Sequence, residues 1–184
     1  MFIVFEGIDC SGKTTLSKKL VEKMPTNWLW TKEPTFSSEE ADRLNLGSKD
    51  DVGREVEFCV DRTKHQNILL QLLNHGHSIV CDRYIWSGIT YSKLFNPSAY
   101  EFAKTLYQHD FFIKPDYYVF VDTPIEVCIE RCKDRAQSEE QLSKLREFYL
   151  ETKKYVDKKS KIITIESVGN IDDCVNKIKD MICQ

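Results

Sequence analysis

The residues best suited to chemistry stand together near the N-terminus of this chain. Residues 7 to 14 read Gly-Ile-Asp-Cys-Ser-Gly-Lys-Thr, which fits the spacing G-x-x-x-x-G-K-[ST]. Glycines at these positions let backbone N–H groups curl round an anion, Lys13 can reach β- and γ-phosphates, and the hydroxyl of Thr14 suits Mg²⁺. The pattern predicts a P-loop for a nucleoside triphosphate. The loop residues expected to bind it are Gly7, Ile8, Asp9, Cys10, Ser11, Gly12, Lys13, Thr14 and Thr15.

A carboxylate at the end of a neighbouring strand would complete a magnesium site beside this loop. Asp82 ends one strand-like run and Asp122 ends another. We favour Asp82, because Arg83 follows it at once and places charges of both signs at the same edge of the sheet. Asp122 could instead cap the helix that follows it. The sequence therefore predicts Thr14 and Asp82 as metal-binding residues, with ATP and Mg²⁺ as the bound species.

Short apolar runs alternate with longer amphipathic stretches along the chain. Buried strands are expected at residues 2–5, 28–31, 78–81, 117–121 and 162–165. Helices are expected after the P-loop, over residues 50–76, after residue 123, and from residue 170 onward. Strands that alternate with helices indicate βαβ units. We predict an α/β protein with the three-layer P-loop NTPase fold, a five-stranded parallel sheet with helices on both faces, as a single domain over residues 1–184.

Local signals support individual helices. Residues 123 to 126, Thr-Pro-Ile-Glu, are typical of a capping box with proline at the first helical position. In the long helix, apolar residues recur at intervals of three and four, first Val56, Cys59 and Val60 and then Leu69, Leu72 and Leu73. Two polar stretches, residues 37 to 53 and residues 131 to 140, are expected to be mobile, and a charged run such as the second is usually a solvated face.

Composition excludes several classes of protein. The net charge of −3 argues against a nucleic-acid-binding surface, and no apolar run approaches the ~20 residues of a membrane span. The seven cysteines are odd in number and scattered through apolar segments, and Met1 opens directly into a strand-like run. We therefore expect free thiols in a reducing, cytoplasmic compartment. Cys128 and Cys132 lie four apart, but core packing is a better interpretation than a metal site.

A longer set of motifs resembles thymidylate kinase over nearly the whole chain. Its most specific part is the string D-R-Y-x-x-S-G-x-x-Y that begins at Asp82. The resemblance implies transfer of the γ-phosphoryl group of ATP to dTMP by a homodimer. The acceptor is already an anionic oxygen, so the chemistry requires cations rather than a strong base. The substrate-binding residues implied by the family are Asp9, Glu33, Pro34, Phe58, Arg62, Arg83, Ser87, Gly88 and Tyr91.

The family assigns individual roles to several of these positions. Phe58 matches an aromatic residue that stacks on thymine, and Arg62 matches an arginine that hydrogen-bonds the base. Tyr91 matches the position that excludes a ribose 2′-hydroxyl, and Asp9 matches the carboxylate that meets the sugar 3′-hydroxyl. Core packing remains the alternative for Phe58, and a surface ion pair remains the alternative for Arg62.

The same resemblance assigns the cations. Lys13 and Arg83 are expected to be catalytic, and Arg83 also to hold the acceptor phosphate. Residues 131 to 140 are expected to form a short lid in which Arg131 covers ATP while Lys133 and Arg135 act as catalytic cations.

Three features depart from the family pattern. Cys10 stands where eukaryotic members carry a P-loop arginine, so the transition-state cation should come from residues 131 to 135. The lid is also shorter than in the eukaryotic pattern. Phe36 stands where an acceptor-phosphate arginine is often found, which weakens that grip unless Lys32 or another cation compensates.

Other functions remain open at this point. A deoxynucleoside kinase would need a carboxylate base near the first strand, and Glu6 could serve. A nucleoside monophosphate kinase of broader specificity would accept other bases. A P-loop protein that binds nucleotide without catalysis is the alternative from a different class. Acceptor assays with dTMP and thymidine would separate the first two.

Overall fold

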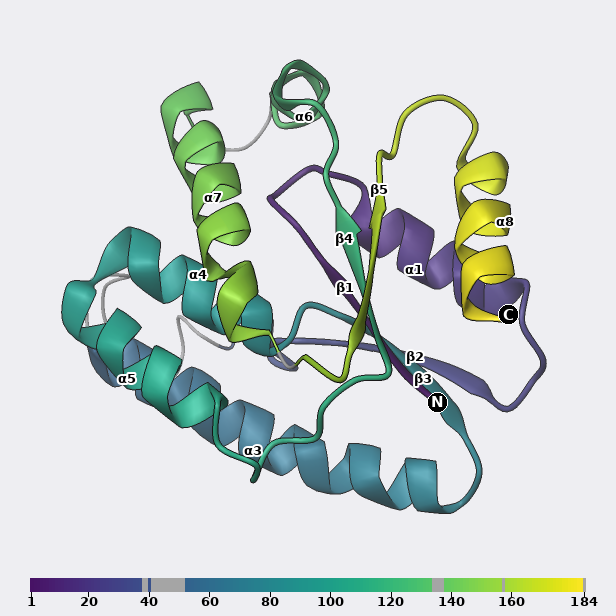
Figure 1. Cartoon of the computed structure of the whole chain (residues 1–184), viewed down its shortest axis with the longest axis horizontal. Helices are drawn as coiled ribbons and strands as arrows, with labels where there is room; N and C mark the ends of the chain where they lie inside the picture. Colours follow the sequence, from purple (N-terminus) through teal and green to yellow (C-terminus); the bar gives the residue numbers. More distant parts are fainter. Residues whose placement is uncertain (38–39, 41–51, 134–137, 157, 184) are drawn as a thin grey trace.

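The computed structural model describes residues 1–37, 40, 52–133, 138–156 and 158–183 of the chain (Figure 1). Its strands are β1 (Phe2–Glu6), β2 (Trp28–Lys32), β3 (Ser78–Asp82), β4 (Tyr117–Val121) and β5 (Lys161–Ile165). Its helices are α1 (Lys13–Glu22), α3 (Val52–Asn74), α4 (Ile85–Phe95), α5 (Pro97–Tyr107), α6 (Ile125–Arg131), α7 (Glu139–Thr152), η1 (Lys153–Tyr155) and α8 (Ile171–Ile182).

The five strands form one parallel sheet in the order β2-β3-β1-β4-β5, which confirms the predicted sheet. Strand β1 is central, with β3 on one side and β4 on the other. Val4 pairs with Cys81 of β3 and Tyr118 of β4, so the segments that follow these strands leave the sheet along the same edge. This edge receives the P-loop and the Asp82-Arg83 pair, because ligands of open α/β sheets bind beyond the carboxyl ends of the strands.

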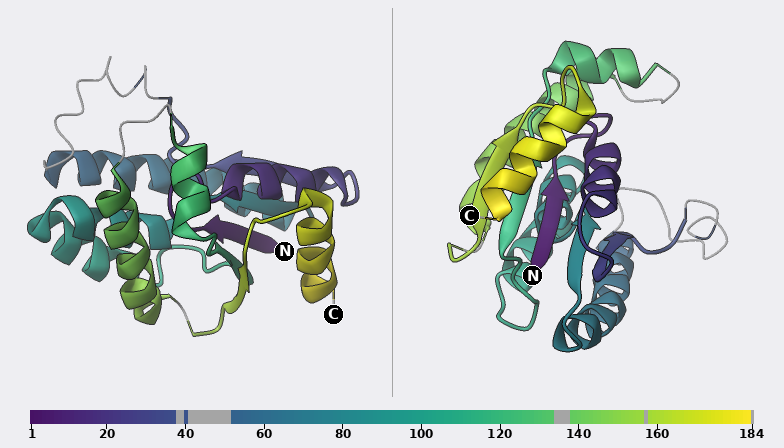
Figure 2. Two further views of the ribbon diagram at one scale, coloured as in Figure 1. Left: turned by 90° about the horizontal axis from the view of Figure 1, so that it is seen from above. Right: turned by 90° about the vertical axis from the view of Figure 1, so that its right-hand side faces the viewer.

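Side-chain alternation along β1 divides the core into two layers. Phe2 and Val4 belong to the apolar cluster on one face, whereas Ile3 and Phe5 belong to the cluster on the other. Helices α1 and α8 cover the second cluster, and helices α3, α4, α5, α6 and α7 lie on the opposite side of the sheet (Figures 1 and 2). The three-layer fold is therefore confirmed, because each face of the sheet carries its own helices.

The local predictions agree with the structure only in part. Thr123 does not cap α6: the helix begins at Ile125 with no side-chain cap, and the Thr123 hydroxyl donates to Ser11 O at 2.8 Å instead. The long helix is present as α3, but its apolar residues differ in burial: Leu69 is buried, whereas Val56 and Val60 are 41% and 40% exposed. Helices α4 and α5 were not predicted as elements, although Asn96 and Pro97 are a strong start signal for α5.

Of the remaining predictions, one is confirmed and others concern residues that the structure does not describe. Asn170 caps α8 as predicted, accepting from Asp172 N at 2.8 Å. Most of the stretch 37 to 53, which was expected to be mobile, lies outside the described residues, as does Arg135. Among the residues that the structure describes, none of the helices has the length and apolar character needed to span a membrane.

Candidate active site

The P-loop closes round a space that only glycine permits at two positions. Gly7 and Gly12 have φ angles of 144° and 99°, which L side chains rarely adopt. A Cβ on Gly7 would lie 2.5 Å from Val121 O, and a Cβ on Gly12 would lie 2.4 Å from Ser167 Oγ. The loop is thus pressed against the end of β4 and the segment before α8, and α1 begins at Lys13 directly behind it.

Lys13 lies inside this loop. Its ammonium group donates to the Ile8 carbonyl and lies 3.4 Å from Ser11 Oγ. Burial, followed by the nearby positive charge of Arg83, lowers the pKa of Lys13 to about 7. An arriving phosphate would reverse this penalty, because it supplies the negative charge that the buried ammonium lacks.

The metal-binding pair predicted from sequence is brought together. The Thr14 hydroxyl donates to Asp82 Oδ2, and Asp82 Oδ1 is buried with no hydrogen-bond partner among the described residues. Asp122 is engaged elsewhere, because Arg146 binds it through two hydrogen bonds of 2.6 and 2.8 Å. A hydroxyl and an unsatisfied carboxylate oxygen are hard oxygen donors, so Thr14 and Asp82 fit Mg²⁺ and Asp122 does not.

Arg83 stands at the centre of the edge. Its φ angle of 70° is unusual for a residue with a side chain. Its guanidinium forms an ion pair with Asp9 and lies over the ring of Tyr91, with Cζ 4.8 Å from the ring centroid. The Tyr91 hydroxyl donates to Asp9 Oδ2 at 2.8 Å. The three residues to which the family assigns phosphate and sugar binding therefore form one connected group.

Glu6 fixes the segment that follows Arg83. Its carboxylate accepts from Tyr84 N at 2.9 Å, Ser87 N at 3.1 Å and the Ser87 hydroxyl, with the Tyr149 hydroxyl at 3.3 Å. The side chain is fully buried, and burial raises its pKa. Because both oxygens are occupied inside the protein and Glu6 lines neither of the two cavities described below, it is not placed to act as the base of a deoxynucleoside kinase.

A cavity of about 280 Å³ opens on one side of Arg83. It contains every residue predicted to bind the acceptor. Its lining comprises Asp9, Glu33, Pro34, Arg54, Glu55, Phe58, Asp61, Arg62, Arg83, Tyr84, Ser87, Gly88, Tyr91, Ser92, Phe95 and Ala99. We call it the acceptor cavity.

Arg62 is held in the wall of this cavity by a buried ion pair. Its Nε donates to Glu33 Oε2 at 2.6 Å, and the other Glu33 oxygen lies 3.0 Å from His65 Nδ1. Arg62 is only 5% exposed, so it does not form the surface ion pair considered as the alternative. Its Nη1 is buried without a hydrogen-bond partner among the described residues, and a ligand that brings an acceptor would satisfy it.

Sequence reasoning missed further residues of the cavity. Glu55 accepts from the hydroxyls of Ser92 and Tyr107, each at 2.7 Å, and burial raises its pKa. Arg54 also lines the cavity, with Cζ 5.8 Å from the Phe58 ring centroid. Both stand three or four residues before Phe58, and this helical spacing was the signal that would have found them.

Neither Phe36 nor Lys32 lies where it could hold the acceptor phosphate. Phe36 stacks on Phe58, with ring centroids 5.8 Å apart and planes inclined by 5°, but does not itself line the cavity. Lys32 is exposed and also lies outside the lining. The cations of the acceptor cavity are therefore Arg54, Arg62 and Arg83.

A second cavity of about 440 Å³ lies on the P-loop side of Arg83, and we call it the phosphate cavity. It is lined by Asp9, Cys10, Gly12, Lys13, Thr14, Thr15, Arg83, Arg131, Ser167 and Ile171. Asp9 and Arg83 line both cavities, which therefore adjoin at this ion pair. The arrangement can place two phosphate-bearing ligands end to end.

The predicted lid is only partly described. Arg131 ends α6 and donates to Ser167 O at 2.7 Å and Ser11 O at 3.5 Å, at the wall of the phosphate cavity. Lys133 is exposed, with Nζ 4.0 Å from Glu130 Oε1, and does not line the cavity. A capping box at Ser138 already begins α7, so the connection between the helices is shorter than the predicted lid.

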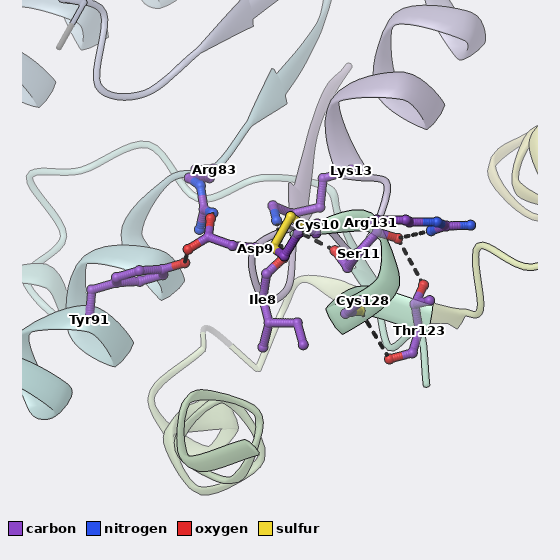
Figure 3. The surroundings of a disulfide bond; sticks show 11 residues. Ile8, Asp9, Cys10, Ser11, Lys13, Arg83, Tyr91, Thr123, Cys128 and Arg131 are labelled. Carbon is purple, nitrogen blue, oxygen red and sulfur yellow. Dashed lines mark hydrogen bonds and ion pairs between the residues drawn. A yellow bond between two sulfur atoms is a disulfide. The ribbon is translucent and has the colours of Figure 1, made fainter. Parts of the chain in front are cut away.

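A disulfide joins the P-loop to the end of α6 (Figure 3). It links Cys10 to Cys132, whose Cα atoms are 5.8 Å apart. The expectation that all cysteines are free thiols was therefore wrong for this pair. Core packing is confirmed for both Cys128 and Cys132, which are buried in the same apolar cluster, although Cys132 is also disulfide-bonded. The 122 residues that separate Cys10 from Cys132 concealed the pairing, because linear spacing carries no sign of it.

Comparison with known proteins agrees with this geometry. The family model for thymidylate kinase matches residues 5–178. A probable thymidylate kinase of Methanocaldococcus jannaschii is 36% identical over 157 residues, which cover 82% of this chain and 80% of the relative. The thymidylate kinase of Plasmodium falciparum is 32% identical over 187 residues, which cover 96% and 87%.

The solved structure of thymidylate kinase from Candida albicans has the same fold, with a TM-score of 0.76 at 23% identity. The match covers 98% of this chain and 90% of that one. The family expected from the D-R-Y string and the P-loop is thus confirmed by sequence and by fold. The chain belongs to the thymidylate kinase family.

Proposed function

We propose that this chain is an ATP-dependent thymidylate kinase that transfers the γ-phosphoryl group of ATP to dTMP and yields dTDP and ADP. The observation that carries the proposal is the junction of two cavities at Arg83 and Asp9. One cavity has a P-loop and a metal-binding pair, as a triphosphate requires. The other has an aromatic ring and a buried arginine with an unsatisfied nitrogen, as a nucleobase requires.

Phosphoryl transfer between two polyanions depends on cations at the point where they meet. Lys13 holds the β- and γ-phosphates from the P-loop side, and Arg83 holds the acceptor phosphate from the other side. Thr14 and Asp82 would hold Mg²⁺, which supplies charge neutralisation across the transferred group when bound. The acceptor is an anionic oxygen, so none of these residues has to remove a proton.

The far wall of the acceptor cavity selects the base and the sugar. Phe58 offers a ring face for stacking, and Arg62 Nη1 donates to a base carbonyl. Tyr91 and Asp9, joined by their hydrogen bond, meet the sugar and leave little room for a 2′-hydroxyl. Glu33 and Pro34 support this wall, and Ser87 and Gly88 complete it beside Arg83.

The remaining cations belong to the segment after α6. Arg131 at the wall of the phosphate cavity is assigned to ATP binding. Lys133 and Arg135 are assigned as lid cations that reach the transferred phosphoryl group once ATP is bound, since Cys10 leaves the P-loop without an arginine of its own. Replacing both by alanine should lower kcat strongly while leaving dTMP binding intact, and wild-type turnover of the double variant would remove the lid role.

An acceptor panel tests the proposed activity directly. ADP release should be measured with ATP and Mg²⁺ against dTMP, dUMP, dGMP and thymidine. We expect the highest kcat/KM with dTMP and none with thymidine, because Glu6 is not available as a base. Turnover of thymidine without turnover of dTMP would overturn the proposal, and the absence of ADP release with every acceptor would favour a nucleotide-binding protein without catalysis.

We further propose a cytoplasmic homodimer whose other partners are small molecules, not nucleic acid or a membrane. The exposed apolar side chains of Val56 and Val60 on α3 support an interface, since they lie one helical turn apart. Sedimentation of the wild type and of Val60→Asp tests the dimer. A wild-type monomer at micromolar concentration would contradict it.

A further inference from the structure

Cys10 is the one residue of the P-loop that is joined covalently to another element. It stands between Asp9 and Ser11, and its Sγ is bonded to Cys132 at the C-terminal cap of α6 (Figure 3). Cys132 directly follows Arg131 in the chain. The disulfide therefore connects the loop that receives the triphosphate to the segment that carries a cation of the same cavity.

The backbone of Cys10 adopts a conformation that is unusual for a residue with a side chain. Its φ angle is 60°, in the left-handed region that residues with a Cβ adopt at a cost of about 1 kcal/mol or more. The other positive φ angles among the loop residues belong to glycines, Gly7 and Gly12. A left-handed residue here also suits the P-loop, whose backbone N–H groups converge on an anion, and the cysteine side chain adds the covalent bond to Cys132.

Arg131 depends on few other contacts. Its guanidinium donates to the carbonyl oxygens of Ser167 and Ser11 at 2.7 and 3.5 Å, and the second distance is a long one for a hydrogen bond. Among the described residues, no carboxylate lies within ion-pair distance of it. The disulfide at the next residue adds a covalent restraint on the backbone that carries this guanidinium.

We propose that Cys10 and Cys132 are positioning residues for phosphoryl transfer: their disulfide holds Arg131 against the phosphate cavity, so that oxidation of the pair tightens the site for ATP. The inference rests on the proposed function, because it concerns the donor side of the same site. The disulfide does by a covalent bond part of what an arginine at position 10 would do by charge, since it keeps a cation beside the loop.

The chemistry of opening and closing balances as thiol–disulfide exchange. A dithiol reductant attacks through one thiolate at Cys10 Sγ, the more accessible sulfur, and expels Cys132 as a thiolate. The second thiol of the reductant then releases Cys10, so that two electrons and two protons pass to the protein and the reductant becomes a disulfide. A small-molecule disulfide such as oxidised glutathione reverses both steps.

Because Cys10 lines the phosphate cavity, bound ATP should also shield the disulfide. We expect saturating ATP to slow reduction by dithiothreitol several-fold, whereas saturating dTMP does not. This readout requires no turnover. It therefore separates a failure of the present inference from a failure of the proposed kinase activity.

The test compares oxidised and reduced wild-type protein with Cys10→Ser, Cys132→Ser and the control Cys183→Ser, which removes an exposed free thiol far from the loop in sequence. Each preparation is assayed for free thiols, for ATP affinity by calorimetry, and for KM and kcat. We expect reduction to weaken ATP binding by roughly fivefold or more with KM for dTMP unchanged. Cys10→Ser and Cys132→Ser should match the reduced enzyme and ignore dithiothreitol, and Cys183→Ser should behave as wild type.

Equal ATP affinity in the oxidised and reduced forms would overturn the inference, as would tighter ATP binding on reduction. A purified chain in which all seven cysteines titrate as thiols, even after treatment with oxidised glutathione, would overturn it as well. Thermal melting of each variant shows whether it is folded. Because Cys10→Ser and Cys132→Ser remove the same disulfide, the two variants should also give the same ATP affinity.

Discussion

The acceptor cavity and the phosphate cavity adjoin at one ion pair, yet their side chains are held in different ways. In the acceptor cavity, Arg62 is paired with Glu33, and Glu55 accepts two hydroxyl groups. In the phosphate cavity, Lys13 lies against its own loop. Asp82, which accepts from the Thr14 hydroxyl of the lining, keeps one oxygen without a partner among the described residues. The cavities therefore differ in charge pairing: Arg62 is ion-paired before a ligand enters, whereas Lys13 forms no ion pair with a described carboxylate. Two polar atoms of the acceptor wall, Arg62 Nη1 and the Tyr84 hydroxyl, still lack hydrogen-bond partners among the described residues.

This difference gives the acceptor cavity and the phosphate cavity different tasks in the proposed reaction. Polar groups that are already paired keep fixed positions, so the acceptor cavity can discriminate by shape and by the single unsatisfied nitrogen of Arg62. The buried ammonium of Lys13 forms no ion pair with a described carboxylate, so its charge is costly in the empty protein and is compensated when phosphates arrive. Selection is therefore built into one side, and catalytic charge is assembled on the other.

The largest effect should come from removing the P-loop lysine of the phosphate cavity. Lys13→Ala is expected to lower kcat by about 10³-fold, because one preorganised donor at developing charge is worth this much. The dissociation constant for dTMP should stay within about twofold, since Lys13 does not line the acceptor cavity. Steady-state kinetics and calorimetry with dTMP check the two halves.

Lys19→Ala is the matched control, because this side chain lies on the same helix and is 39% exposed in a surface pair with Glu22. It should turn over at the wild-type rate. If Lys13→Ala weakened dTMP binding as much as it slowed turnover, the result would contradict the claim that the two cavities have separate tasks.

A smaller effect should follow from removing the stacking ring of the acceptor cavity. Phe58→Ala is expected to raise KM for dTMP by about 30-fold, since stacking of a base on an aromatic side chain is worth ~1–3 kcal/mol. KM for ATP should not change. Initial rates over a grid of both substrates provide the measurement.

Phe36→Ala sharpens the same comparison. Phe36 stacks on Phe58 without lining the cavity, so its loss should raise KM for dTMP only about threefold, through a less rigid Phe58. Equal effects of the two variants would mean that Phe36 itself meets the base.

The smallest effect concerns Glu55 and appears in stability. Burial raises the pKa of Glu55, with Arg62 on its own helix and the Ser92 and Tyr107 hydroxyls from α4 and α5 opposing this change. The folded state therefore keeps the proton to a higher pH than the unfolded chain, whose pKa is near 4.5. As pH rises above that value, the folded protein bears the cost of a buried charge, and stability from this group falls.

Glu55→Gln cannot ionise, so its free energy of unfolding should gain on the wild type as pH rises from about 4.5 to neutrality, by on the order of 1 kcal/mol. Thermal melting of both proteins at several pH values provides the measurement. A difference that does not change with pH would show that the pKa of Glu55 is the same in the folded and unfolded states, which would contradict the expected shift.

Most of the fold and much of the site could be predicted because their signals are local. The P-loop, the five apolar runs and Asp82-Arg83 each lie within a few residues, and the parallel sheet then gathers them at one edge. Periodicity predicted the long helix but not which of its apolar residues are buried, since that depends on what packs on the helix, as at Val56 and Val60. The capping-box prediction at Thr123 was wrong, because the Thr123 hydroxyl donates to the Ser11 carbonyl of the P-loop instead of capping α6.

The rest of the site depends on contacts distant in sequence. Glu55 meets Ser92 and Tyr107 only because α3, α4 and α5 pack together. The disulfide joins Cys10 of the P-loop to Cys132 at the end of α6, and neither cysteine has a partner at any recognisable spacing. Such pairings follow from topology, which sequence patterns specify only indirectly.

The ion pair of Asp9 and Arg83 has a consequence for how the two substrates influence each other. A phosphate that enters either cavity competes with Asp9 for the same guanidinium, and the first to arrive leaves less of that competition for the second. The two affinities are then expected to be coupled, and by thermodynamic reciprocity ATP changes the affinity for dTMP by the same factor by which dTMP changes the affinity for ATP. An enzyme of this kind responds to the smaller of its two substrate pools most sharply when the other is abundant.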